Sequence, residues 1–203
     1  MAFVDQVVVM LKAPRPGWVK TRLAQRIGVL AATEAYRSLA MQVLANLPDL
    51  PAVELRHAPD DASAEVAPWL RSGWTLAPQG DGDLGSRIVR AFAEHFAAGA
   101  RRVVVLGADC PYVTAEDISE AFNALTKVDL VLGPAVDGGY WSVGLTVPRP
   151  ELFSGVAWST ALVLAQTEQR AAALGISVAR LRTLSDVDTE DDWQQWRESR
   201  SCP

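Results

Sequence analysis

The sequence contains 203 residues, of which 49% are hydrophobic and 21% charged, and its formal net charge at pH 7 is -5. A chain of this length can bury one well-filled core, and no linker rich in Ser, Gly or Pro divides it, so we expect a single domain over residues 1–203. The acidic balance argues against nucleic acid or an anionic membrane surface as the main partner, because both require a broad basic face.

The first apolar run, Val7–Leu11, is too short for a secretory signal or a membrane span, and Asp5 precedes it. No later stretch approaches the length of a membrane span. The two cysteines, Cys110 and Cys202, provide no disulfide framework. We therefore expect a cytoplasmic protein with no membrane span.

Strand-like and helix-like segments alternate along most of the chain. Segments rich in β-branched or aromatic residues predict strands at Val7–Leu11, Val53–His57, Trp74–Ala77, Arg102–Gly107, Asp129–Leu132, Tyr140–Leu145 and Ile176–Leu181. Apolar residues three or four positions apart predict helices at Ala31–Leu47, Leu84–Ala98, Ala115–Leu125, Thr160–Leu174 and Thr189–Ser199. This order predicts an α/β fold with a largely parallel sheet, whose ligand sites lie beyond the carboxyl ends of the strands. The connection between residues 132 and 140 is too short for a helical crossover, which predicts an antiparallel or mixed part of the sheet.

A cationic loop containing two prolines follows the first predicted strand. No acidic residue occurs between Gln6 and Thr33, and the basic residues of this stretch are Lys12, Arg15, Lys20, Arg22 and Arg26. The prolines fix the backbone and Gly17 allows a sharp turn, so that Lys20 and Arg22 are predicted to face a polyphosphate. The alternative is a solvated loop with incidental charge.

Asp109 follows the buried strand predicted at 102–107. A carboxylate at a strand end suits a hard cation, and Mg²⁺ typically takes one or two protein carboxylates together with substrate phosphates. We therefore predict Asp109 to be a metal ligand with a distant partner; the alternative is that it caps the turn. Thr114 is predicted to cap the next helix, and Cys110, with no neighbouring His, to be a packed thiol.

Two further segments carry carboxylates. Asp186-Val-Asp188-Thr189 precedes a predicted helix, and Asp188 or Thr189 serves as its N-cap, which leaves one of Asp186 and Asp188 as the second metal ligand. The glycine-rich turn around Asp137 and Gly138 either lets a ligand approach the backbone or is a simple hairpin turn.

Residues 80–85 read Gly-Asp-Gly-Asp-Leu-Gly, which has the G-x-G-x-x-G spacing of dinucleotide-binding proteins. The acidic side chains of Asp81 and Asp83 would repel a pyrophosphate, so we predict that residues 79–85 contact a base or ribose instead, through Gln79, Gly82 and Asp83. A dinucleotide-dependent oxidoreductase is the less favoured alternative.

The assembled motifs resemble the radical-SAM/selenodomain-associated transferase family of the GT-A-like nucleotide-diphospho-sugar transferase superfamily. The motifs run in order over nearly the whole chain, as Lys12-x-Pro-x-Pro-Gly-x-Val-Lys-Thr-Arg-Leu23, Gln79-Gly-x-Gly-Asp-Leu-Gly85, Gly107-x-Asp-Cys-Pro111, Gly133-Pro-Ala-x-Asp-Gly-Gly-Tyr140, Trp158-Ser-Thr160 and Asp186-Val-Asp-Thr189. The resemblance implies a Rossmann-like GT-A fold, in three αβα layers with a mostly parallel mixed sheet.

The resemblance also implies Mg²⁺- or Mn²⁺-assisted transfer from a nucleoside triphosphate or a nucleotide-sugar to a small acceptor. The implied catalytic residues are Lys20, Arg22 and Asp109, the implied metal ligands are Asp109, Asp186 and Asp188, and the implied nucleotide contacts are Lys12, Arg15, Gly17, Gln79, Gly82, Asp83, Asp137 and Gly138. The first loop lacks the Gly-x-Gly pattern of well-studied nucleotidylyltransferases, so glycosyl and nucleotidyl transfer both stay open.

Residues 158–160 are expected to form an acceptor-side loop; the alternative is that Ser159 caps the following helix. A nucleotide-sugar-binding module without catalysis is the alternative function from another class.

Overall fold

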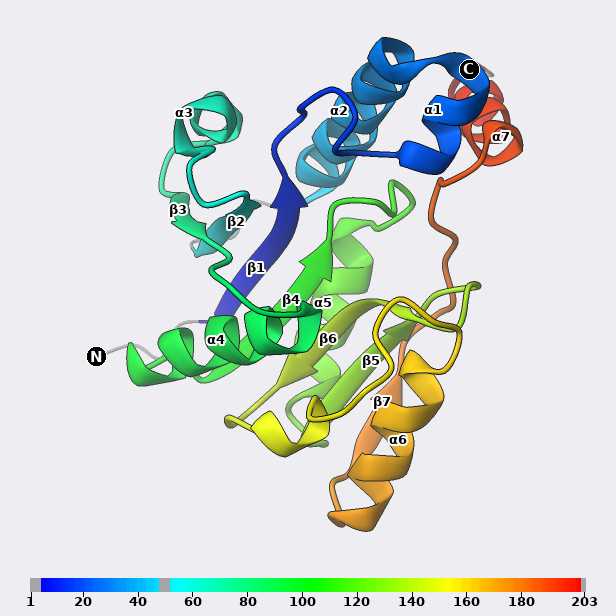
Figure 1. The fold of residues 1–203 in the computed structure, drawn as a ribbon. Coiled ribbons are helices and arrows are strands. Elements are labelled where there is room, and N and C mark those ends of the chain that lie inside the picture. The colour runs from blue at the N-terminus through cyan, green and yellow to red at the C-terminus, as the bar shows by residue number, and fades with distance from the viewer. Residues whose placement is uncertain (1–4, 48–51, 202–203) are drawn as a thin grey trace.

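The computed structural model describes residues 5–47 and 52–201 (Figure 1), so Cys202 lies outside the described residues. The strands are β1 (Asp5–Lys12), β2 (Val53–Ala58), β3 (Thr75–Pro78), β4 (Arg102–Gly107), β5 (Leu130–Pro134), β6 (Tyr140–Leu145) and β7 (Val178–Arg180). The α-helices are α1 (Thr21–Ile27), α2 (Val29–Asn46), α3 (Ser63–Val66), α4 (Leu84–Ala97), α5 (Ala115–Ala124), α6 (Val163–Ala173) and α7 (Glu190–Ser201). Short 3-10 turns lie at Ala67–Trp69 and Pro150–Leu152.

The strands form a seven-stranded sheet in the order β3-β2-β1-β4-β6-β5-β7. β6 is antiparallel to both of its neighbours, β4 and β5, and the other neighbouring pairs are parallel. The predicted mostly parallel mixed sheet is therefore confirmed, together with the antiparallel part at residues 130–145.

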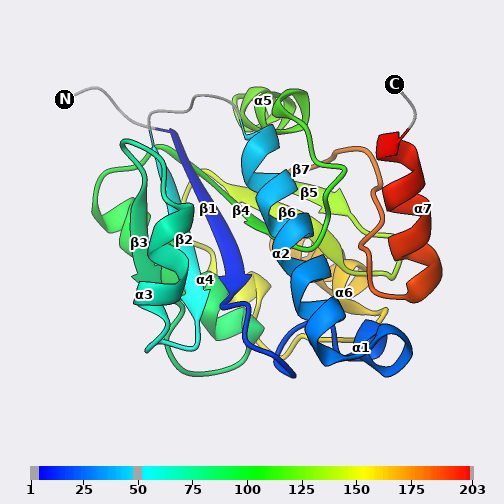
Figure 2. The same cartoon turned by 90° about the horizontal axis from the view of Figure 1, so that it is seen from above.

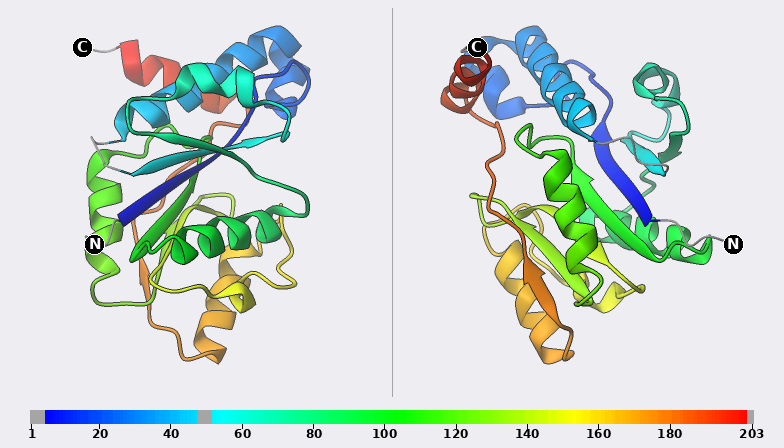
Figure 3. Two further views of the ribbon diagram at one scale, coloured as in Figure 1. Left: turned by 90° about the vertical axis from the view of Figure 1, so that its left-hand side faces the viewer. Right: turned by 180° about the vertical axis from the view of Figure 1, so that it is seen from behind.

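Helices cover both faces of the sheet, which makes three layers (Figures 1 and 2). On one face, α2 and α5 pack on side chains such as Val9, Leu55 and Leu106; Figure 3, right, shows α5 in front of the sheet on this side. On the other face, α4 and α6 pack on the alternate side chains, such as Val8 and Val105. Because both faces are covered, central strands such as β1 are continuously apolar rather than alternating.

Several predicted helix boundaries need correction. α2 begins at Val29 rather than Ala31, and the short helices α1 and α3 were not among the five predicted helices. Ser159 does not cap α6: it has a positive φ of 63°, and α6 begins at Val163 with no side-chain cap. Thr160 begins a turn instead, in which its hydroxyl oxygen Oγ1 accepts from Leu162 N at 3.2 Å. The predicted cap at Thr114 is confirmed as part of a capping box on α5.

The carboxyl ends of the parallel strands lie at one edge of the sheet. The loops that leave them contain residues 13–20, 79–83, 108–114, 135–139 and 181–189. A parallel bridge between Ala135 and Leu184 brings the last two of these segments side by side. In Figure 1 the segment between β7 and α7 rises past the ends of β4 and β5 toward α1. This edge is where the sequence places its charged motifs.

No helix within the described residues is both long enough and apolar enough to span a membrane.

Candidate functional site

Lys20 lies at the centre of the candidate site. Its side chain is only 3% exposed, and its ammonium nitrogen Nζ lies 2.9 Å from Asp109 Oδ1 and 2.8 Å from Asp188 Oδ1. Burial alone would lower the pKa of Lys20, but the two carboxylates outweigh it and raise the pKa above its usual value. One buried and protonated lysine therefore joins the first loop to carboxylates from two distant parts of the chain.

Asp109 projects from the loop after β4, and its side chain is 52% exposed. The neighbouring Cys110 is buried, and its thiol donates to the Ser185 carbonyl at 3.3 Å. Burial raises the pKa of Cys110 to about 12, with Asp186 adding to the shift, so the thiol is neutral at physiological pH. The prediction that Cys110 is a packed thiol is confirmed.

Asp188 reaches the site because residues 184–187 lie across the ends of β5 and β4. Leu184 N donates to Pro134 O at 3.0 Å, and Val187 N donates to Asp109 O at 3.4 Å. The first turn of α7 is capped by Thr189, whose Oγ1 accepts from Asp192 N at 3.2 Å. Since Thr189 provides the cap, the carboxylate of Asp188 is left to pair with Lys20.

Asp186 lies in the same negative environment but outside the ion pairs of Lys20. Burial raises the pKa of Asp186 to about 7; the charges of Asp109, Asp137 and Asp188 add to the shift, and Lys20 opposes it. Asp188 therefore shares the Lys20 ammonium with Asp109, and Asp186 lies close enough to Asp109 for the two charges to interact.

Arg15, from the same loop as Lys20, turns away from the carboxylate pair. Its Nη2 atom lies 2.5 Å from Glu65 Oε1 and 3.0 Å from Asp61 Oδ1. Gly17 has a positive φ of 82°, as expected at a sharp turn. The guanidinium of Arg15, for which a phosphate contact is predicted, therefore pairs with carboxylates of α3 and of the loop before it.

Lys12 and Arg22 lie on either side of Lys20 in the sequence. Lys12 is exposed, and its backbone is fixed by the buried Tyr36 hydroxyl, which accepts from Lys12 N at 2.7 Å and donates to Lys12 O at 3.0 Å. Arg22 lines a shallow hollow with Arg26 and residues 189–191. The contribution of Tyr36 was not predicted, since an apolar-faced helix gives no signal that one hydroxyl reaches the end of β1.

The side chain of Gln79 is used inside the protein. It is buried; its Nε2 atom donates to Leu11 O at 2.8 Å and to Arg56 O at 2.9 Å, while Oε1 accepts from Arg87 Nη1 at 3.1 Å. These contacts secure the end of β3 to the strand ends beside it. Its backbone is used as well, because Gln79 N donates to His57 O at 2.9 Å and its carbonyl accepts from Arg90.

Two arginines of α4 hold the loop at residues 79–83. Arg90 donates to the carbonyls of Gln79 and Asp81, the latter at 2.9 Å, and Arg87 Nε donates to Gly82 O at 3.1 Å. The loop carbonyls are thereby turned toward α4. The only sequence signal for this arrangement is a pair of arginines three residues apart that follows a glycine-rich turn.

The G-x-G-x-x-G spacing is explained by capping and packing. Asp83 Oδ1 accepts from Ser86 N at 2.8 Å and from Ser86 Oγ at 2.7 Å, so a carboxylate occupies the start of α4 where a dinucleotide pyrophosphate would bind. A Cβ on Gly85 would lie 2.5 Å from the indole nitrogen of Trp158, so this glycine permits close packing. Both observations weigh against a dinucleotide site here.

The turn at residues 135–139 packs on the predicted acceptor-side loop. Gly138 has φ 87°, and a Cβ on it would lie 2.3 Å from the carbonyl oxygen of Ala161. Leu164 N donates to Gly138 O at 3.0 Å. Asp137 is exposed and accepts from Gly139 N at 2.8 Å, and its charge reaches Asp186. The structure therefore places Asp137 beside the site, whereas Gly138 is used for packing.

The carboxylates of Asp109 and Asp188 fit a hard divalent cation. Their Oδ1 atoms converge on one point, the Lys20 ammonium, and the two side chains are 52% and 46% exposed. Within residues 5–47 and 52–201 no group of three or more His, Cys, Asp or Glu side chains is arranged to hold a metal. A pair of carboxylates nevertheless matches the usual protein share of a Mg²⁺ shell, which water and substrate phosphates complete.

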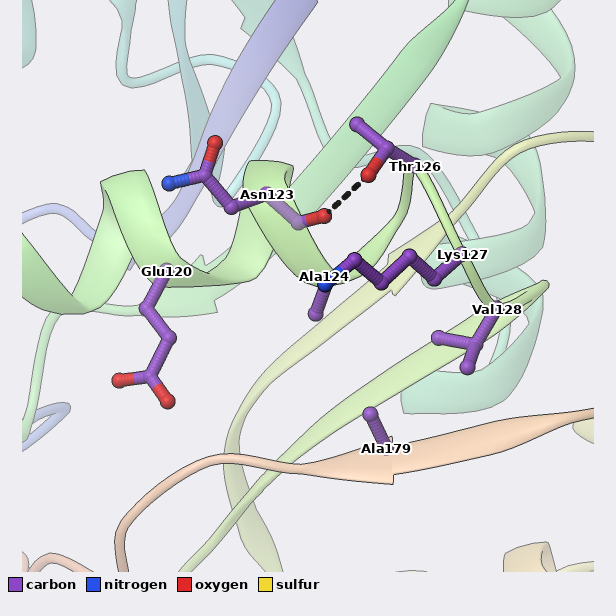
Figure 4. A pocket seen from close by; sticks show the side chains of 7 residues that line it. All are labelled: Glu120, Asn123, Ala124, Thr126, Lys127, Val128 and Ala179. Atoms are coloured by element: carbon purple, nitrogen blue, oxygen red, sulfur yellow. Dashed lines mark hydrogen bonds between the residues drawn. The ribbon is translucent and has the colours of Figure 1, made fainter.

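A separate hollow lies near the amino end of β5, on the edge of the sheet opposite the carboxylates (Figure 4). The end of α5, the turn after it and Ala179 of β7 line it. Within its lining, Thr126 donates to the Asn123 carbonyl at 2.7 Å. None of the predicted site residues lines this hollow, so it does not contribute to the candidate site.

A model of one protein family matches more than half of this chain. Residues 41–160 match the family model described as "Uncharacterized protein conserved in bacteria (DUF2064)". The chain belongs to this family. The matched range of DUF2064 includes Asp109, Asp137 and the loop at residues 79–83, whereas Lys20 and Asp188 lie outside it.

One curated relative resembles this DUF2064 chain in sequence, and one solved structure resembles it in sequence and fold. Phosphoenolpyruvate guanylyltransferase from Chloroflexus aggregans is 33% identical over 130 residues, which span 64% of this chain and 58% of that protein's length. A candidate nucleotide-diphospho-sugar transferase from Desulfovibrio desulfuricans G20 is 29% identical, with a TM-score of 0.87 over 97% of this chain and 95% of that chain.

A more distant structure shares the fold alone. Glucosyl-3-phosphoglycerate synthase from Mycobacterium tuberculosis is 12% identical, with a TM-score of 0.52 over 89% of this chain and 70% of that chain. That protein was solved with Mn²⁺, uridine diphosphate and its product. The DUF2064 chain therefore shares its fold with these transferase structures.

Proposed function

We propose that this DUF2064 protein transfers a nucleotidyl group from a nucleoside triphosphate to a small phosphorylated acceptor, with the help of a divalent metal. The observation that carries the proposal is the convergence of Asp109, Asp188 and Lys20 at the carboxyl ends of the strands. Ligands bind at this edge in open α/β sheets. The similarity to a guanylyltransferase supports this reaction class.

Asp109 and Asp188 are the side chains that would hold Mg²⁺ or Mn²⁺. When bound there, the metal neutralises charge on phosphate oxygens and helps to align the triphosphate with its acceptor. Lys20 adds a protonated ammonium from the first loop, and Arg22 adds a guanidinium from the first turn of α1. Positive charge and alignment are the main requirements of such a transfer, in which no protein nucleophile takes part. The neutral, buried Cys110 is consistent with this mechanism.

The second candidate is glycosyl transfer from a nucleotide-sugar. It is favoured by the similarity to the Desulfovibrio protein, which extends over nearly the whole of both chains. The same pair of carboxylates would serve either reaction, because in both of them negative charge develops on phosphate oxygens.

Product analysis separates the two reactions. The purified protein is incubated with Mg²⁺ or Mn²⁺ and either GTP, CTP, UTP or ATP together with phosphorylated small acids, including phosphoenolpyruvate, or with GDP- and UDP-sugars. Nucleotidyl transfer releases pyrophosphate and joins the nucleoside monophosphate to the acceptor; glycosyl transfer releases a nucleoside diphosphate. Nucleotide binding without either product would favour a non-catalytic module and would overturn the proposal.

A further inference from the structure

We propose that the Lys20 ammonium is the resident counter-ion of the cation site, and that a divalent metal binds Asp109 and Asp188 by displacing it. This inference rests on the proposed function and adds a regulatory step to the same site. Lys20 Nζ lies 2.9 Å from Asp109 Oδ1 and 2.8 Å from Asp188 Oδ1, which places one positive charge between the two oxygens.

The ammonium and a metal compete for the same place. Mg²⁺ binds oxygen ligands at about 2.0–2.1 Å, so an ion held by both Oδ1 atoms would lie where Lys20 Nζ now lies, or in contact with it. Like charges at that separation repel strongly in a partly buried site. Binding of the metal therefore requires the ammonium to leave.

The surroundings of Lys20 account for its position between the carboxylates. Asp186 lies close enough to Asp109, Asp137 and Asp188 for their charges to interact, and this group of carboxylates needs a nearby cation. Lys20 reaches Asp109 and Asp188 from a left-handed backbone conformation, at φ 46°, which is unfavourable for a residue with a side chain and is maintained by the surrounding contacts.

Displacement gives Lys20 its second role. The lysine side chain is long and has rotatable bonds throughout, so its ammonium can turn from the carboxylates to another anion without rearrangement of the backbone. A metal that arrives with a triphosphate provides both the replacement charge for the carboxylates and a new anionic partner for Lys20. The charge at the carboxylates thereby changes from one positive unit to two.

Mn²⁺ binding without nucleotide tests the competition. Free Mn²⁺ is measured by electron paramagnetic resonance for the wild type, Lys20→Met and, as a control with the same change in net charge, Lys127→Met, which lies on an exposed turn far from the site. We expect Lys20→Met to bind Mn²⁺ about tenfold more tightly than the wild type, within the usual range of coupling between two sites. Lys127→Met should match the wild type. Equal or weaker binding by Lys20→Met would overturn the inference.

A measurement on the wild type separates true displacement from a local effect of charge, and it applies even if Lys20→Met does not fold. The sequence contains three lysines, Lys12, Lys20 and Lys127. In protein labelled with ¹⁵N-lysine, the ammonium signal of buried, hydrogen-bonded Lys20 should be observed without metal, and saturating Mg²⁺ should shift or abolish it while the Lys127 signal stays unchanged. A Lys20 signal that is unaffected by bound Mg²⁺ would refute displacement.

The two proposals fail in distinguishable ways. Transfer activity with an unmoved Lys20 signal would leave the proposed function intact and remove this inference. A displaced Lys20 signal with no product from any nucleotide would do the reverse.

Discussion

Arg182 and Asp117 form a two-point ion pair that links elements 65 residues apart in sequence. Arg182 Nε lies 2.5 Å from Asp117 Oδ1, and Nη2 lies 2.7 Å from Oδ2. Asp117 is in the first turn of α5 and its side chain is 4% exposed, whereas Arg182 follows β7. The pair therefore fixes the segment that delivers Asp188 to the candidate site.

We expect Arg182→Met to destabilise the protein by about 1–3 kcal/mol at pH 7, because a buried carboxylate loses its charged partner. Burial alone would raise the pKa of Asp117, but the hydrogen bonds and charge of Arg182 and the hydrogen bonds from Thr114 outweigh it and lower the pKa. A carboxyl group with a lowered native pKa contributes stability above its unfolded pKa of about 4, and that contribution is lost as the pH falls through the native pKa. The difference in unfolding free energy between wild type and Arg182→Met should therefore become smaller below about pH 4.

Urea denaturation at pH values from 7 to 3 measures this difference. Arg180→Met is the matched control, since it removes the same charge two residues away, where Arg180 pairs with Glu168 at the surface. Its effect should be small and nearly independent of pH. If the difference in unfolding free energy between wild type and Arg182→Met stays constant from pH 7 to pH 3, Arg182 does not lower the pKa of Asp117.

Asp109→Asn should reduce the proposed transfer activity about a hundredfold or more, because one charged ligand to the phosphate-bound metal is lost. The melting temperature should change little, since the Asp109 side chain is about half exposed and Asn has nearly the same shape. Turnover at saturating nucleotide and acceptor, measured beside Glu116→Gln on the exposed surface of α5, checks the effect. Wild-type turnover in Asp109→Asn would remove Asp109 from the mechanism.

Gly138→Ala should be more destabilising than Gly99→Ala, although both glycines have similar positive φ values of 87° and 92°. A Cβ on Gly99 meets nothing within 4 Å, so Gly99→Ala should cost only the backbone term of about 1–2 kcal/mol. A Cβ on Gly138 would lie 2.3 Å from the Ala161 carbonyl oxygen, which should add about 1–3 kcal/mol of overpacking. Unfolding free energies from urea titration give the comparison. Equal costs would mean that residues 158–162 are free to move away from this turn.

Arg90→Lys should raise the KM for nucleotide several-fold while lowering kcat less. A single ammonium cannot match the planar guanidinium that binds the carbonyls of Gln79 and Asp81 together, so the loop should lose its fixed position. Steady-state kinetics with nucleotide and acceptor varied separately make the measurement. An unchanged KM for nucleotide, with the fold intact, would argue that this loop does not contact the nucleotide.

The sequence carried enough information for the sheet and for part of the site. Apolar runs bounded by Gly, Pro or Asp identify strands that are buried on both faces, as at β1 and β4, and the carboxylates after them follow from the rule that parallel strands end at one edge. The N-cap at Thr114 was readable because a capping box is a local pattern of four residues.

Contacts between residues far apart in the sequence could not be predicted, because no local sequence pattern indicates them. Arg15 pairs with Glu65, 50 residues away, and nothing in the sequence around either residue indicates that contact. A glutamine at a strand end has the same local sequence whether it faces a ligand or, like Gln79, the neighbouring backbone. Ser159 satisfies the composition of a cap, but its positive φ places it in a turn ahead of α6.

The separation of Lys20 and Asp188 by 168 residues has a consequence for biosynthesis. A ribosome completes the sequence of all seven strands, which end at Arg180, before it adds Asp188. A nascent chain at that stage has the residues of the sheet and the Lys20–Asp109 pair, but lacks the second carboxylate. A polypeptide terminated prematurely at that point would therefore contain the sequence of the strands but lack the second carboxylate of the proposed cation site.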